Sequence, residues 1–308
     1  MRRSIIILLL ILSVHISSNA RATIEIKYKI GEEIITNFDI LNEQKYLIFL
    51  RPELNKLSKE ELEKISKNSL IREIIKKNEI KRIFKDFEDE NYLKNIKKNL
   101  FKFKNVKNEK ELKDLLNKKK IRYEDIIDKM KFEGLWNELI YKKYNSMVKI
   151  NEEKLKNDLT LKISNEKKYE YKLSEIIFDV ESKEKVDDMY SQILNYIKMN
   201  NFKVAASKFS LSNTASKGGD IGWVKETLLA EKFLNILSKL KIGEITKPIK
   251  YSNGYLIIKV NDKKIMKQIN NFDKELKEII NFERNRQLNQ FSLLHYKKLR
   301  QNIIINEF

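Results

Sequence analysis

Residues 215–223 read Ala-Ser-Lys-Gly-Gly-Asp-Ile-Gly-Trp, and this glycine-rich stretch is the strongest indication of fold in the second half of the chain. Glycine is scarce, with seven in 308 residues, yet five of the seven lie between Gly218 and Gly254. Because glycine adopts backbone conformations that other residues rarely adopt, this concentration predicts a module rich in tight turns. It does not predict a phosphate-binding loop, since no Gly-Lys-Ser or Gly-Lys-Thr follows and no dinucleotide-binding strand precedes it.

The segments on both sides of this stretch predict a sheet with flanking helices. Tyr169, Tyr171 and Leu173 alternate with polar residues, which is typical of a half-buried strand leading into residues 176–178. Helical spacing of apolar residues follows over about 186–197 and 202–209. Asn253-Gly254, placed before the apolar run that starts at Tyr255, is a strong hairpin signal. This order of elements predicts an α+β module with an antiparallel sheet.

The rest of the chain is predicted to be mainly helical. Residues 23–35 alternate and break at Gly31, which predicts a short hairpin or strand pair. Apolar stripes at helical spacing then recur to about residue 165, with Leu70, Ile71, Ile74, Ile75, Leu93, Ile96, Leu100, Leu112, Leu115, Leu116, Phe132, Leu135, Trp136, Leu139 and Ile140 among them. We expect one helical domain there, a last long helix over about 266–300 and a closing strand at Ile303-Ile304-Ile305.

Composition excludes several classes of chemistry. The absence of cysteine removes thiol catalysis, disulfides and thiolate zinc sites. With His15 and His295 as the two histidines, the sequence also argues against a Ser-His-Asp hydrolase or a multi-histidine metal site. We therefore expect no metal and no cofactor.

The net charge of +19, from 63 Lys and Arg against 44 Asp and Glu, leaves two interpretations. Such a charge is found in proteins that bind nucleic acid or anionic membrane surfaces. Here the lysines are scattered and interleaved with glutamate, without a compact arginine-rich cluster, which favours solvated helix faces.

The first 22 residues have the order of a secretory signal peptide. Met1-Arg2-Arg3 is positively charged, residues 5–14 are apolar except Ser13, and small residues follow up to Ala22. The apolar run is shorter than the roughly 20 residues that a membrane span needs. We expect cleavage after Ala20 or Ala22 and export to the periplasm.

An ordered set of motifs resembles a known family. Phe209-Ser210, the stretch 215–223, Gly243-Glu244-Ile245 to Pro248, and Asn253-Gly254-Tyr255 together resemble the parvulin (PpiC) class of peptidyl-prolyl isomerase domains, over roughly residues 169–262. A parvulin segment between a helical region and a returning terminal helix, behind a signal peptide, is similar to the SurA-like periplasmic chaperones. A single parvulin segment is found, where the best-known members carry two.

The resemblance implies a domain plan of four parts. These are a signal peptide at 1–22, a SurA-like helical N-terminal domain at 23–165, a parvulin-like domain at 166–264, and a C-terminal helix and strand at 265–308 that pack on the N-terminal domain. The implied fold class is α+β, with a helical chaperone domain completed by the C-terminal helix and a parvulin domain of antiparallel sheet and flanking helices.

The resemblance also implies where a proline-containing substrate would bind. The family's apolar pocket corresponds to Ile221, Leu229 and Phe233, which suit a proline ring but equally suit an ordinary core. The family's two catalytic histidine positions correspond to Glu175 and Leu256, and its two other polar positions to Ser212 and Asn253. Leucine neither donates nor accepts hydrogen bonds, and a carboxylate opposes negative charge on a substrate carbonyl. We expect Glu175, Ser212, Asn253, Leu256 and Phe233 to line one cavity whose shape survives while its catalytic electrostatics are lost.

Three hypotheses about function follow. The first is a periplasmic chaperone that binds unfolded or extended clients, such as outer-membrane proteins, without ATP, and makes at most transient contact with the membrane surface or the assembly machinery. The second is an active peptidyl-prolyl cis-trans isomerase that assists the folding of exported proteins. The third, binding of nucleic acid or a membrane surface through the basic charge, is the least favoured, and we expect no nucleic-acid partner.

Overall fold

The computed structural model describes residues 23–84, 90–163, 168–252 and 254–308. The predicted signal peptide and Asn253 therefore lie outside the described residues. Among the helices that are described, none is both long enough and apolar enough to cross a bilayer.

A four-stranded antiparallel sheet forms the centre of the second half of the chain, in the order β4-β3-β6-β5. The strands are β3 (Tyr169–Phe178), β4 (Asp220–Lys225), β5 (Ile249–Tyr251) and β6 (Gly254–Ile265). The strand predicted from residue 169 and the hairpin predicted after Gly254 are both present, and β3 pairs with β6 along its whole length. The α+β fold class is confirmed.

Alternation along β3 gives the sheet two different faces. Ile176 and Phe178 pack against α7 (Val186–Met199) and α8 (Phe202–Phe209). Tyr171, Leu173 and Ile177 face the other way, in a cluster to which α9 (Glu231–Leu237) and α10 (Phe272–Gln301) contribute. We call this second group the lower cluster; its buried members are Tyr171, Leu173, Ile177, Val224, Leu229, Leu237, Ile249, Leu256, Ile258, Val260 and Leu293.

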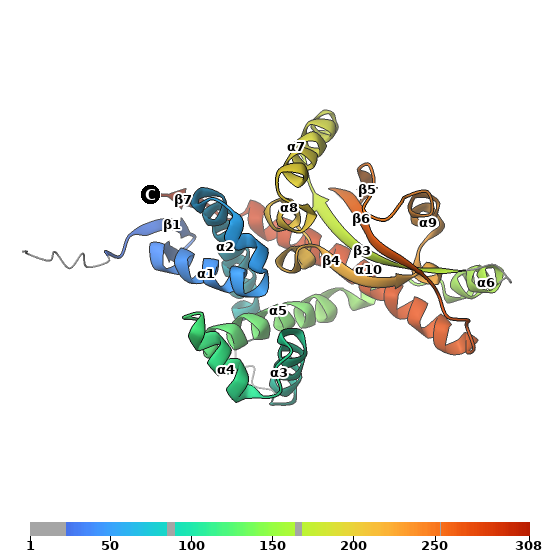
Figure 1. Ribbon diagram of the computed structural model, residues 1–308, viewed down its shortest axis with the longest axis horizontal. Coiled ribbons are helices and arrows are strands. Elements are labelled where there is room, and N and C mark those ends of the chain that lie inside the picture. The colour runs from blue at the N-terminus through green and yellow to red at the C-terminus, as the bar shows by residue number, and fades with distance from the viewer. Residues whose placement is uncertain (1–22, 85–89, 164–167, 253) are drawn as a thin grey trace, which may run out of the picture.

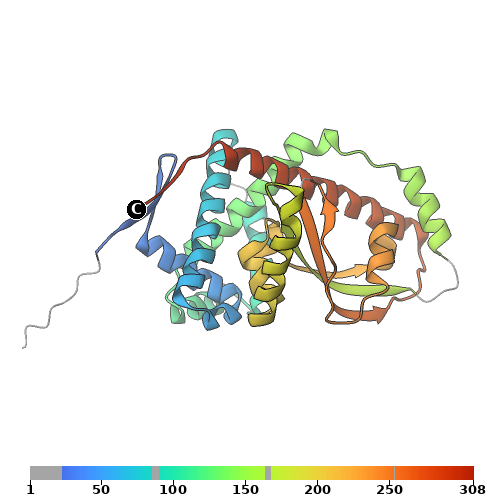
Figure 2. The ribbon, with the colours of Figure 1, turned by 90° about the horizontal axis from the view of Figure 1, so that it is seen from above.

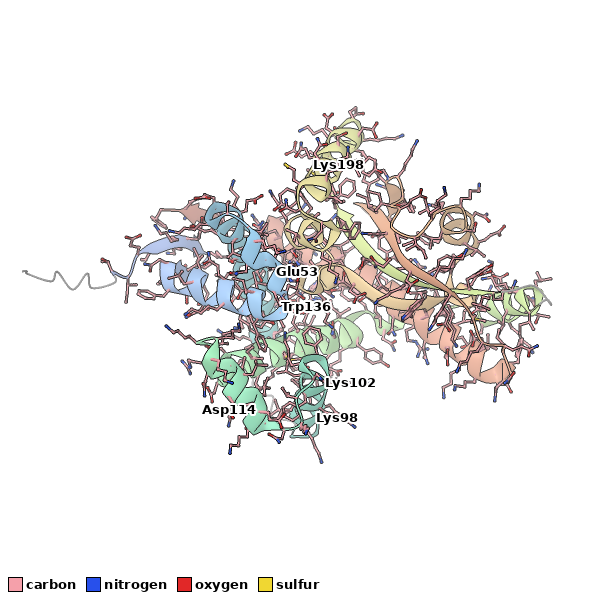
Figure 3. All side chains as sticks on the ribbon, in the orientation of Figure 1. Glu53, Lys98, Lys102, Asp114, Trp136 and Lys198 are labelled. Carbon is pink, nitrogen blue, oxygen red and sulfur yellow. The ribbon has the colours of Figure 1, made fainter. Side chains whose placement is uncertain are left out.

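The first half of the chain is a helical body. Its helices are α1 (Asn37–Leu50), α2 (Lys59–Ile83), α3 (Glu90–Lys104), α4 (Glu109–Lys118), α5 (Tyr123–Tyr144) and α6 (Glu152–Lys162). Trp136 on α5 has no exposed surface and its Nε1 donates to Ser292 Oγ of α10 at 2.8 Å. Figure 3 shows Trp136 inside this body, while Lys98 and Lys102 on α3 point away from it.

The terminal helix α10 runs along both halves of the molecule (Figure 2). It contacts α2, α5 and α6 of the helical body, and its Phe282 and Leu293 pack into the lower cluster of the sheet. Packing of this helix on the N-terminal domain was expected from the resemblance, whereas its contact with the sheet was not.

The two ends of the described chain meet in a second, three-stranded sheet. Its strands are β1 (Ile26–Ile30), β2 (Glu33–Thr36) and β7 (Ile305–Glu307), in the order β2-β1-β7. The hairpin predicted over 23–35 is present, whereas the closing strand begins at Ile305 and not at Ile303. Its pairing with β1 joins the end of α10 to the helical body.

Candidate functional site

A hydrogen-bonded carboxyl lies where β3 meets the segment that follows α8. Glu175 Oε1 accepts from Ser212 Oγ at 2.6 Å and from Thr214 Oγ1 at 2.9 Å. Ser212 precedes the short helix η4 (Asn213–Lys217), and its Oγ also accepts from the Thr214 amide at 3.2 Å. The hydroxyl of Ser212 is thereby fixed by both its own turn and the carboxylate.

The glycine-rich stretch brings these residues together. The Glu175 amide donates to the Gly219 carbonyl oxygen at 2.8 Å. Gly219 has φ +77°, and a Cβ there would lie 2.2 Å from the Glu175 carbonyl oxygen. Only glycine allows such a close backbone approach, so this residue sets the distance between η4 and β3.

Burial changes the acidity of this group. Desolvation raises the pKa of Glu175 above its ordinary value, and the hydrogen bonds from Ser212 and Thr214 partly oppose the rise. Nearby Tyr251, on β5, has its pKa raised to about 12, mainly by its own burial and to a smaller degree by the Glu175 charge. The carboxyl therefore keeps its proton to higher pH than an exposed glutamate.

The cavity around Glu175 is bounded on one side by α2 of the helical body and by α10. Its walls include Arg72 from α2 and Asn289, Ser292 and Tyr296 from α10. Arg72 donates through Nη2 to the Ser210 carbonyl at 3.0 Å and through Nη1 to the Ser212 carbonyl at 3.4 Å. These bonds attach the turn that carries Ser212 directly to α2.

Of the other family positions, those that the structure describes do not line this cavity. Leu256 is buried in the lower cluster, and Asn253 lies outside the described residues. Leu229 and Phe233 belong to the lower cluster as well, whereas Ile221 is 38% exposed on the edge strand β4. The expectation that five side chains line one cavity is thus not met: Glu175 and Ser212 line it, and the apolar residues lie beside it.

The polar cavity and the lower cluster are nevertheless neighbours. Ile177, Tyr251 and Leu293 belong to both, because they line the cavity and pack in the cluster. A carboxyl with two hydroxyls therefore sits at the margin of an apolar patch on the same face of the sheet.

A polar attachment that the sequence did not reveal holds α10 to the sheet. Glu275, 5% exposed near the start of α10, accepts from Thr227 Oγ1 at 2.5 Å and pairs with Lys225 Nζ at 2.8 Å. Lys225 also pairs with Glu278 at 2.5 Å. The i, i+3 spacing of Glu275 and Glu278 places both carboxylates on one helix face and was the available signal.

The described histidine, His295, has a structural role. His295 is 5% exposed, with Nδ1 2.9 Å from Tyr144 Oη and Nε2 3.0 Å from Glu79 Oε1, inside the helical body. Among the described residues, no three His, Cys, Asp or Glu side chains are grouped so that they could hold a metal ion.

Comparison with known families identifies the domain that contains this sheet. The family model of the rotamase, PPIC-type PPIASE domain matches residues 171–262, which include most of β3 and β6, all of β4 and β5, α7 to α9, and both Glu175 and Ser212. The chain carries a parvulin domain. The parvulin resemblance is thereby confirmed, with one such domain in the chain.

Related proteins place this domain in a chaperone and foldase group. The chaperone SurA of Pseudomonas putida is 26% identical over 155 residues, which cover 47% of this chain and 36% of that protein. The foldase protein PrsA of Geobacillus kaustophilus is 40% identical over 83 residues, which cover 27% of this chain and 28% of that protein. A solved SurA-like chaperone of Campylobacter jejuni aligns over 92% of this chain and 98% of its own, with 17% identity and a TM-score of 0.37. The matched segments thus span about a third of the curated relatives, and the chain is similar to SurA and PrsA within the parvulin-containing chaperones and foldases.

Proposed function

We propose that this chain is an exported chaperone that holds unfolded polypeptides, and that its parvulin domain has weak or no isomerase activity. The clients we infer are outer-membrane proteins in the periplasm. Similarity to SurA and PrsA supports the chaperone part of the proposal.

The observation that carries the second part is the surroundings of Glu175. Rotation about an X-Pro bond crosses a barrier of about 18–20 kcal/mol, which a site lowers by gripping the ring and stabilising the twisted amide with fixed polar groups. At the two positions where the family has imidazoles, this domain has a carboxyl and a buried leucine. Contacts from α2 and α10 also surround the carboxyl, which restricts access of a substrate amide.

Exposed apolar side chains suggest where a client is held. Five large apolar residues lie between positions 24 and 41, just before β1 or within β1, β2 and α1, and 37–73% of their surface is exposed: Ile24, Ile26, Ile34, Phe38 and Leu41. Apolar surface of this kind suits extended polypeptides, which expose their own apolar side chains. The excess of Lys and Arg over Asp and Glu in the chain would raise the rate of encounter with acidic client segments.

An aggregation assay tests the chaperone function. The full chain without its first 22 residues is added to an unfolded outer-membrane β-barrel protein diluted from urea, and light scattering is recorded without ATP. We expect delayed aggregation, reduced in Phe38→Ser with Leu41→Ser and retained in Ile242→Ser, which changes a 59% exposed residue on the parvulin domain. No delay with the unaltered chain would contradict the proposal.

An active isomerase is the second candidate function. It is favoured by the Glu175–Ser212–Thr214 cluster, because a carboxyl with a raised pKa can donate its proton in a hydrogen bond to a substrate carbonyl. Acceleration of a proline-limited refolding reaction, lost in Phe233→Ala, would support this candidate.

A further inference from the structure

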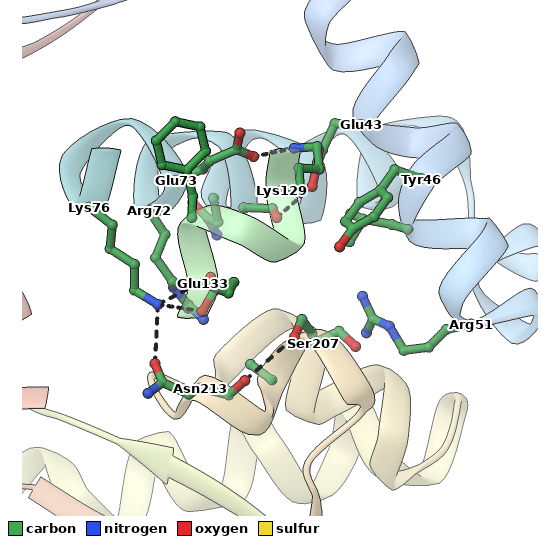
Figure 4. A pocket seen from close by; sticks show the side chains of 16 residues that line it. Glu43, Tyr46, Arg51, Arg72, Glu73, Lys76, Lys129, Glu133, Ser207 and Asn213 are labelled. Atoms are coloured by element: carbon green, nitrogen blue, oxygen red, sulfur yellow. Dashed lines mark hydrogen bonds and ion pairs between the residues drawn. The ribbon is translucent and has the colours of Figure 1, made fainter. Parts of the chain in front are cut away.

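A second cavity lies between the helical body and the parvulin domain (Figure 4). It has a volume of about 80 Å³ and is bounded by α1, α2 and α5 on one side and by α8 and η4 on the other. Arg72, Lys76 and Asn213 line both this cavity and the one around Glu175, so the two cavities adjoin at these side chains.

Most charges in this cavity are paired within it. Lys129 pairs with Glu43 at 2.7 Å and with Glu73, and Ser69 Oγ donates to Glu43 Oε1 at 2.6 Å. Lys76 pairs with Glu133 at 3.1 Å and donates to Asn213 Oδ1 at 3.2 Å. Figure 4 shows these pairs on the side of the cavity away from Arg51.

Arg51 is different. It caps the end of α1, where its amide donates to the Leu47 carbonyl at 2.9 Å, and Pro52 behind it starts the short helix η1 (Pro52–Lys56). Its side chain is 5% exposed and points into the cavity, towards the side where Ser207 lies. Its Nε and Nη1 are buried without a hydrogen-bond partner.

The charge of Arg51 persists despite burial. Desolvation lowers the pKa of its guanidinium to about 10, which leaves it protonated at neutral pH. Glu43 and Glu53 act on it through space, but among the described residues neither forms an ion pair with it. The lining contributes four cations, Arg51, Arg72, Lys76 and Lys129, against three anions, Glu43, Glu73 and Glu133.

A buried guanidinium with two unpartnered nitrogens is costly, since buried charges in proteins are normally paired. We propose that this cavity binds one small oxyanion group, a carboxylate or a phosphate, through Arg51. The volume admits a group of that size, and arginine is the side chain best suited to planar or tetrahedral oxyanions. The group can be a free ion or the acidic side chain of a bound peptide. This site does not depend on the isomerase or client proposals.

Thermal unfolding of the full chain tests the site. Sodium phosphate and sodium acetate are each compared with sodium chloride at equal ionic strength, for the unaltered chain, Arg51→Met and Arg122→Met. Arg122 is 75% exposed in its side chain and pairs with Asp125 at 3.8 Å, so its substitution removes the same charge outside the cavity. An anion that binds the folded chain raises its unfolding temperature, by about 2 °C or more at saturating concentration.

We expect that rise in the unaltered chain and in Arg122→Met, and its loss in Arg51→Met. Equal responses of Arg51→Met and the unaltered chain would overturn the proposal. A further experiment compares two short peptides that differ only in having Glu or Gln at one position. If only the Glu peptide binds, and its binding requires Arg51, the oxyanion is the acidic side chain of a client. If the unfolding temperature rises only with phosphate or acetate, the oxyanion is a free ion. No response in any arm refutes the site.

A second variant keeps the test valid if Arg51→Met does not fold. Ser207→Asp places a carboxylate on the cavity wall that faces Arg51. We expect this variant to unfold at a higher temperature than the unaltered chain and to lose the response to added anions. A lower unfolding temperature with an unchanged response would contradict the assignment.

Discussion

Glu175 and Leu256 are diagonal neighbours on one face of the parvulin sheet. Glu175 pairs with Ile258 across β3 and β6, and Leu256, two residues before Ile258, pairs with Ile177. Side chains in this relation lie within reach of long or aromatic groups. The two positions that the parvulin resemblance assigns to histidine are therefore close together on the sheet, although the carboxyl borders a polar cavity and the leucine lies in the lower cluster.

Restoring both imidazoles should restore activity. Glu175→His combined with Leu256→His is expected to accelerate a proline-limited refolding reaction by about tenfold, because preorganised donors to a developing charge contribute strongly to catalysis. Each single substitution should accelerate refolding very little, because it introduces only one of the two imidazoles. A double variant that folds, as judged by circular dichroism, and remains inactive would show that access to the cavity, rather than its chemistry, prevents catalysis.

The raised pKa of Glu175 predicts a pH-dependent stability. A carboxyl whose pKa is higher in the folded chain than its ordinary value of 4.5 stabilises the fold below that value and loses this contribution as pH rises through the folded pKa. Glu175→Gln keeps an acceptor for Ser212 and Thr214 but has no proton to lose. The free energy of unfolding of this variant, relative to the unaltered chain, should increase from pH 4 to pH 8. An unchanged difference over that range, or the same increase in the exposed control Glu138→Gln, would contradict this explanation.

Acid should act on the helical body through His295. Burial is the main cause that lowers the pKa of this imidazole below 6.5, so the neutral form is favoured in the folded chain. Its contribution to stability is complete above 6.5 and is lost as pH falls below that value. We expect unfolding monitored by the fluorescence of Trp136, in a Trp223→Phe background, to shift to lower urea between pH 7 and pH 5. His295→Gln should reduce this shift in the urea concentration of unfolding. A shift of the same size in the variant would mean that other titrating groups cause it.

The attachment of α10 to the sheet depends on Thr227. Thr227→Val removes the hydroxyl that donates to the buried carboxylate of Glu275, and an unsatisfied buried acceptor costs about 1–3 kcal/mol. Urea unfolding of the full chain measures this loss. Thr160→Val, which changes an exposed hydroxyl bonded within α6, should alter the free energy of unfolding by less than about 0.5 kcal/mol. Equal effects of the two substitutions would remove the reason for treating Glu275 as an anchor.

Local pattern and family resemblance predicted much of the fold. The alternation from Tyr169 and the Asn253-Gly254 signal predicted β3 and the hairpin correctly, because each depends on contacts between neighbouring residues. The resemblance assigned Glu175 and Ser212 to one cavity, but it did not predict the hydrogen bond between them. Thr214 was missed, since its role depends on the turn that Gly219 imposes.

Contacts between distant segments could not be predicted in this way. The apolar spacing of α10 showed that one face is buried, but not that Phe282 and Leu293 cover the sheet. Nothing in the sequence indicated that Arg51 is buried, because an arginine before a proline at a helix end is ordinarily exposed. Both features arise only where the helical body meets the parvulin domain.

If the parvulin domain keeps its fold without efficient catalysis, the chain will not accelerate a refolding reaction that is limited by proline isomerisation. The full chain is added at increasing concentration to a protein whose refolding is limited by proline isomerisation, with Phe233→Ala in parallel. We predict the same rate constant with and without the chain. A rate that rises in proportion to its concentration, and falls back in Phe233→Ala, would contradict the account.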